Sequence, residues 1–69
     1  MKLLNKLYNS EDSVILTFSI KDGDILPVVG SSFSLDKVSY IVVYTKIFFN
    51  FDSPSENNKI ITITAERAF

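Results

Sequence analysis

The chain has 69 residues, of which 46% are hydrophobic, and it contains no Cys and no His. This length allows one domain, residues 1–69, with a shallow core, because folds below about 70 to 80 residues bury little apolar area. The missing Cys and His exclude a disulfide framework and ordinary zinc or haem ligation. Seven basic and eight acidic residues leave a net charge of −1, which makes nucleic acid a disfavoured partner.

The first eight residues combine lysines with leucines, but Asn5 and Lys6 interrupt the apolar run. This pattern predicts neither a signal peptide nor a membrane span. High usage of Ile, Phe, Ser and Asn with a single Arg is typical of an AT-rich genome, such as that of a low-GC bacterium or its phage. We therefore expect a protein of the bacterial cytoplasm.

The conformation of this first segment is open. Leu3 and Leu7, together with Leu4 and Tyr8, fit a short amphipathic helix, whereas the alternation of a strand fits them poorly. We expect a short helix or an irregular lead-in that ends near residues 10–12.

Residues from Ser13 to Ile20 alternate between apolar and polar side chains, which predicts a half-buried strand. Only Ile15 departs from the pattern, because it stands on the polar face. Asp22-Gly23-Asp24 then predicts a tight reversal, since glycine accepts the positive φ that such turns need.

The next apolar stretch, residues 25–30, contains Pro27, which cannot donate a ladder hydrogen bond and so predicts an edge or connecting piece with a bend at Gly30. A short strand follows around Phe33 and Leu35. The dipeptide Asp36-Lys37 is expected to turn this strand into the next one.

Residues 38–51 are dense in β-branched and aromatic side chains and predict the central strand of the sheet. A polar, turn-rich loop follows at residues 52–58, and Lys59 to Arg67 predicts a last strand paired with the central one. Its two expected faces are Ile61, Ile63 and Ala65 against Thr62, Thr64 and Glu66. Four or five short antiparallel strands predict an all-β fold, a meander curled into a small barrel, since closure removes exposed edges.

Four successive stretches of the chain resemble small SH3-like β-barrel proteins of bacterial and phage origin: Asp22-Gly23-Asp24, Pro27-Val28-Val29-Gly30, Phe33-Ser34-Leu35 and Tyr40-Ile41-Val42. In those proteins a Pro-x-x-Gly stretch leads into a strand, and a Tyr-x-Val strand follows. Most of them have no assigned activity. The resemblance therefore implies an SH3-like barrel and no particular site residue.

The chain offers no recognisable catalytic residues, because without His or Cys the common pairings of nucleophile and general base are missing. Asp22 and Asp24 are interpreted as a solvated turn in preference to a metal site, since a calcium loop needs more oxygen ligands at defined spacing. Gly23 and Gly30 are too far apart for a phosphate-binding loop. We predict no enzyme activity, no metal and no cofactor.

The predicted central strand is apolar on both faces, with Ile41, Val43, Ile47 and Phe49 on one and Tyr40, Val42, Tyr44 and Phe48 on the other. Either a bulge moves the strand between faces, or something covers the second face. The covering group is the N-terminal leucines and Tyr8, a second copy or another protein, or a ligand or stacked base. The predicted interface consists of Tyr40, Val42, Tyr44 and Phe48, while Phe49 and Phe51 are assigned to the core.

A possible anion site combines Lys46, Lys59 and Arg67 on the expected hairpin, whose unknown register leaves open whether Lys46 and Arg67 share a face. Surface salt bridges or solvated charges are the simpler interpretation. The leading functional hypothesis is a non-enzymatic interaction module, homo-oligomeric and encoded by a phage or mobile element, that binds a host or phage protein. The alternative is an anti-defence protein that sequesters a signalling nucleotide between subunits, held by these cations and the tyrosines.

Overall fold

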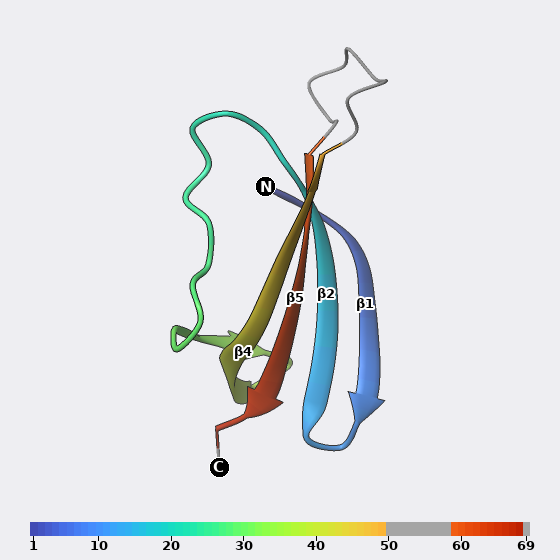
Figure 1. The fold of residues 1–69 in the computed structure, drawn as a ribbon. Helices are drawn as coiled ribbons and strands as arrows, with labels where there is room; N and C mark the ends of the chain where they lie inside the picture. Colours follow the sequence, from blue (N-terminus) through green and yellow to red (C-terminus); the bar gives the residue numbers. More distant parts are fainter. Residues whose placement is uncertain (50–58, 69) are drawn as a thin grey trace.

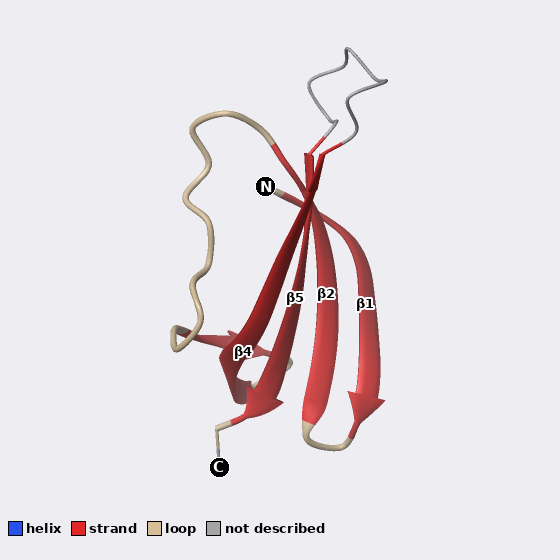
Figure 2. Cartoon of the chain, viewed as in Figure 1, coloured by secondary structure: helices blue, strands red, loops and turns tan. Residues whose placement is uncertain are grey.

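The computed structural model describes residues 1–49 and 59–68, and every regular element within these ranges is a β-strand (Figure 1, Figure 2). The strands are β1 (Lys2–Ser10), β2 (Ser13–Ile20), β3 (Ser32–Leu35), β4 (Val38–Phe49) and β5 (Lys59–Arg67). They form one antiparallel sheet in the order β1-β2-β5-β4-β3, which curls into a half-barrel. The predicted all-β class is confirmed.

The sheet is assembled from two consecutive pieces. β1 and β2 form a hairpin, and a loop over residues 21–31 then carries the chain to the far edge, where β3, β4 and β5 follow as a meander (Figure 1). The two pieces join where β5 pairs with β2, from Ser13↔Glu66 to Ile20↔Lys59. The predicted hairpin of β4 with β5 is confirmed, whereas β4 is not central, because β5 occupies the middle of the sheet.

The reversals lie where the turn residues predicted them. Gly23 has φ of 94°, and its turn is held by the Asp24 amide, which donates to the Lys21 carbonyl at 3.1 Å. Gly30 has φ of 95° at the bend before β3. Asp36 and Lys37 both adopt positive φ, 51° and 68°, which is the conformation of a two-residue hairpin turn whose twist matches that of the flanking strands.

The core lies on one side of the sheet, here called the inner face. Its eight buried side chains come from β2, β4 and β5, the three strands that pair on both sides. The loop residue Leu26 packs against them. The alternation predicted for β2 and β5 is confirmed, because every second residue of these strands points inward, with Phe18 only partly buried. The buried residues are Val14, Leu16, Ile20, Tyr40, Val42, Ile61, Ile63 and Ala65.

A β-bulge divides β4 into two parts. Val42 pairs with Ala65 and Tyr44 pairs with Thr64, so Val43 is an extra residue in the ladder. Because side chains alternate with a period of two, one extra residue exchanges the faces. Even-numbered residues point inward before the bulge and outward after it, which is the first of the two arrangements considered for this strand.

The first segment is a strand, which corrects the expectation of a short helix or irregular lead-in. Two bulges, between Leu3 and Asn5 and between Tyr8 and Ser10, break its alternation, which is why the residues fit a regular strand poorly. β1 therefore lies at the edge of the sheet beside β2. The N-terminal leucines and Tyr8 were one candidate to cover the second apolar face of β4. Because β1 is at the far side of the sheet from β4, they do not cover it.

Candidate interaction surface

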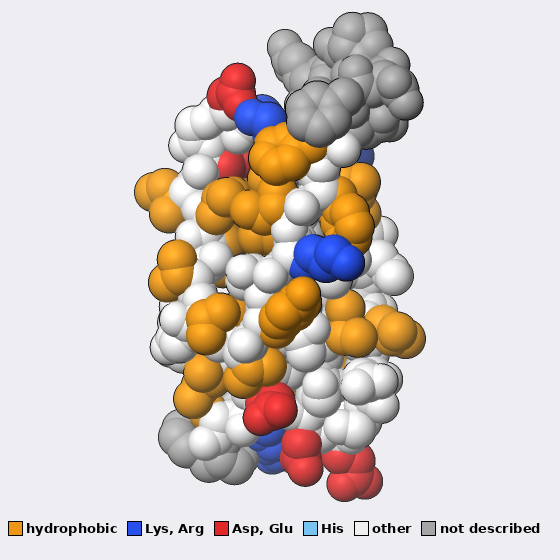
Figure 3. Space-filling view, in the orientation of Figure 1, with side chains coloured by type: hydrophobic (Ala, Val, Ile, Leu, Met, Phe, Trp, Pro, Cys, Tyr) orange, Lys and Arg blue, Asp and Glu red, His pale blue; other side chains and the backbone are white. Residues whose placement is uncertain are grey.

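The outer face of the sheet, opposite the core, presents apolar side chains to solvent (Figure 3). The register aligns Leu7 with Ile15, Ile15 with Thr64, and Thr64 with Tyr44, which makes one row across four strands. A second row contains Phe48 beside Ile60. We call the apolar members of the two rows the outer patch: Leu7, Ile15, Tyr44, Phe48 and Ile60.

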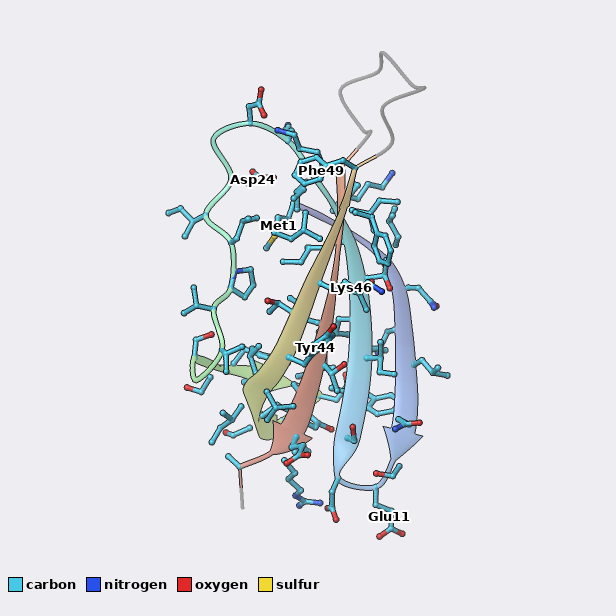
Figure 4. All side chains as sticks on the ribbon, viewed as in Figure 1. Met1, Glu11, Asp24, Tyr44, Lys46 and Phe49 are labelled. Carbon is cyan, nitrogen blue, oxygen red and sulfur yellow. The ribbon has the colours of Figure 1, made fainter. Side chains whose placement is uncertain are left out.

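A polar row separates the two apolar rows. It aligns Asn5, Thr17 and Thr62 with Lys46, so the outer patch is crossed by hydroxyl groups and one cation. The Lys46 Nζ lies 4.8 Å from the centre of the Phe48 ring, and Tyr44 and Lys46 project from the same side of β4 (Figure 4). A cation over an aromatic face is weakly attractive when exposed and more strongly attractive once desolvated.

The four residues of the predicted interface do not share one face. Tyr40 and Val42 belong to the core, with 4% and 1% of their surface exposed, whereas Tyr44 and Phe48 are 57% and 48% exposed on the outer face. The bulge at Val43 is the physical reason. The prediction is corrected for Tyr40 and Val42, and Tyr40 instead stacks on Phe33 with ring centres 5.7 Å apart.

Phe49 differs from its expected place in the core. It stands on the inner side of β4, but 52% of its surface is exposed, beside Lys59 and the turn at residues 22–24. The Lys59 Nζ lies 5.9 Å from the centre of its ring. Phe51, the other ring assigned to the core, lies outside the described residues.

The three cations of the possible anion site are not brought together. Lys59 and Arg67 stand at opposite ends of β5, about 26 Å apart at about 3.3 Å per residue. Lys46 points outward and Lys59 inward, where its Nζ pairs with Asp22 at 2.5 Å. The hydrogen bond from Lys59 lowers the pKa of the Asp22 carboxyl. The tertiary structure therefore provides no shared pocket for one anion at these residues.

Side chains, and not a strand ladder, connect the two edges of the sheet. From β1, Tyr8 Oη and Lys6 Nζ both donate to Asp36 Oδ2 in the β3–β4 turn, the latter at 3.4 Å. The hydrogen bond from Tyr8, then that from Lys6, lowers the pKa of Asp36, while the bond to Asp36 raises the pKa values of Tyr8 and Lys6. These exposed contacts link the β3–β4 turn to β1 across the open side of the half-barrel.

Three members of the outer patch, Leu7, Ile15 and Ile60, were absent from the predicted interface. Ile15 carried a signal, because it is the one apolar residue on the polar face of its strand. Leu7 and Ile60 become neighbours of this surface only through the strand order and register.

Comparison with known families, curated proteins and solved structures finds no match to this chain. In the described ranges no helix is long and apolar enough to cross a membrane. Fold and surface together define a small five-stranded antiparallel half-barrel with an apolar outer face.

Proposed function

We propose that this protein is a non-enzymatic interaction module that associates with a second copy of itself and binds a host or phage protein. The observation that carries the proposal is the exposure of Tyr44 and Phe48 on a face that no other segment of the described chain covers. Apolar patches of this kind on small proteins mark interaction sites, and aromatic residues dominate the binding energy of such sites.

The shallow core supports the same proposal. Eight hydrophobic residues are buried, whereas fourteen large hydrophobic side chains in the described ranges are exposed. Covering part of this area would add to the stability of a fold whose own core contributes little. High usage of Ile, Phe and Asn is typical of an AT-rich genome. This supports a phage or mobile-element gene that is expressed in a bacterial cytoplasm.

Sedimentation velocity over a micromolar to millimolar concentration series tests the self-association. We expect the mean sedimentation coefficient of the wild type to rise with concentration. The double variant Tyr44→Lys, Phe48→Lys should keep the sedimentation coefficient of a monomer at every concentration. Ile25→Lys, Val28→Lys is the matched control, since it adds the same charge at exposed aliphatic residues of the loop. A wild type that stays monomeric throughout, or a control that dissociates equally, refutes self-association through the outer face.

A further inference from the structure

An apolar cavity of about 400 Å³ lies between the two edges of the sheet, on the inner face. β1 contributes Leu3, β2 and β5 contribute Phe18 and Ile63, and β3 contributes Phe33 and Leu35. No strand pairing closes this gap, because β1 and β3 are opposite ends of the sheet order. Its volume falls in the usual range for small-molecule sites, about 300 to 1,000 Å³.

The wall of the cavity has little freedom to collapse onto itself. Ile63 is fixed in the centre of the sheet, and Phe33 is held by its stacking on the buried ring of Tyr40. Lys6 and Tyr8 of β1 reach across the gap to Asp36 and link the two sheet edges beside the cavity. The apolar wall therefore remains in contact with solvent while the cavity is empty.

Two polar contacts limit the length of any occupant. At one end the Met1 amino group pairs with Asp24 Oδ2 at 3.1 Å, beneath the loop of residues 21–31 (Figure 4). Further along β1, Lys6 and Tyr8 contact Asp36. Leu3 stands between these two contacts. A polypeptide strand running through the gap would have to break both, whereas a compact molecule would break neither.

The chemistry of the wall selects against charged molecules. The residues that line it are hydrophobic or serine, the serines being Ser31, Ser32 and Ser34, and none of their side chains is ionised. The nearby Met1 ammonium is already paired with Asp24. A charged ligand would lose hydration here without gaining a counter-ion. The Ser31 hydroxyl donates to the Val28 carbonyl at 2.6 Å and can still accept one hydrogen bond from a neutral group.

We infer that the gap between β1 and β3 is a binding site for a compact, uncharged, largely apolar small molecule. This site is separate from the outer patch, so it does not depend on the proposed interaction function. Binding removes the exposed inner wall from water, and it fills the one side of the half-barrel that the strand ladder leaves open.

Fluorescence titration with neutral N-phenyl-1-naphthylamine tests this inference. We expect saturable enhancement with one site per chain, and weaker binding of the anionic analogue 1-anilinonaphthalene-8-sulfonate. Leu3→Trp places a large ring in the cavity, and we expect it to weaken binding of the neutral probe at least tenfold. Leu7→Trp is the matched control, because it makes the same change on the same strand but on the outer face, and should bind within twofold of the wild type.

Leu35→Trp enlarges an inward-facing side chain of the opposite wall, and it provides the test if circular dichroism shows that Leu3→Trp does not fold. We expect this variant to weaken binding of the neutral probe in the same way. The inference is overturned by the absence of saturable binding to the wild type, by undiminished binding to both filled variants, or by equal loss in Leu7→Trp, which would place the probe on the outer face.

Discussion

Tyr8 and Asp36 are joined by a hydrogen bond although one lies on the first strand and the other in the β3–β4 turn, at opposite edges of the sheet. This contact takes the place of the strand pairing that would close a full barrel. Its partner Lys6 adds a cation to the same carboxylate oxygen. The open side of the half-barrel is therefore spanned by exposed polar side chains.

Replacing Tyr8 with Phe should lower the melting temperature slightly, because the ring is kept and only the hydroxyl donor to Asp36 is lost. The decrease should be smaller than that of a core substitution, since solvent can replace the donor at this exposed site. Thermal denaturation of Tyr8→Phe, Asp36→Asn and the double variant forms a cycle that isolates the contact. Strict additivity in that cycle would show that the two residues do not interact.

Stability should fall in acid below about pH 4. Hydrogen bonds and cations lower the pKa values of Asp22, Asp24 and Asp36 in the folded state, so each contributes stability above its unfolded value, near 3.9. That contribution is lost as the pH falls through the folded pKa. Melting temperatures measured from neutral pH to about pH 2 check this, and Asp36→Asn should show a shallower decline. An equally steep decline in the variant contradicts the role of Asp36.

At alkaline pH stability should fall as the pH rises, the opposite of its change with pH in acid. The pKa values of Tyr8 and Lys6 are raised on folding, so their contribution is complete below their unfolded values, near 10, and is lost as the pH rises through the folded values. A second loss of stability should begin above about pH 10, and Tyr8→Phe should reduce it. An alkaline decline as steep in Tyr8→Phe as in the wild type contradicts the role of Tyr8.

Ile61→Val should cost about 0.5 to 1.5 kcal/mol, because Ile61 is completely buried at the centre of the sheet and the lost methylene leaves a void. The same change at Ile41, which is partly exposed, should cost less than about 0.5 kcal/mol. Urea denaturation measures both free energies of unfolding. Equal costs at the two positions would mean that the inner face is not the core.

Deleting Val43 should be tolerated better than deleting Ile47, although the two side chains are equally exposed, at 40% and 41%. Val43 is the extra residue of the bulge, so its removal leaves Val42 inward, Tyr44 outward and Thr45 inward. Removing Ile47 instead exchanges the faces of Phe48 and Phe49. Circular dichroism and thermal denaturation of the two deletions decide this, and the reverse order of stability contradicts the position of the bulge.

Local pattern alone determined much of this fold. The alternation of apolar and polar residues in Ser13–Ile20 and Lys59–Arg67 predicted both strands and their buried faces, because side chains of a strand alternate whatever its partners are. Asp-Gly and Asp36-Lys37 predicted reversals, since turn conformation depends on the few residues within it.

Tertiary structure alone decided the surface. The bulge at Val43 moved Tyr40 and Val42 into the core and left Tyr44 and Phe48 outside, and no local pattern marks which residue a distant ladder will leave unpaired. The strand status of residues 2–10 likewise came from pairing with β2, which overrode a helical spacing of leucines. The Tyr8–Asp36 contact joins residues 28 positions apart, and the cavity combines residues from Leu3 to Ile63, so only the completed sheet brings them together.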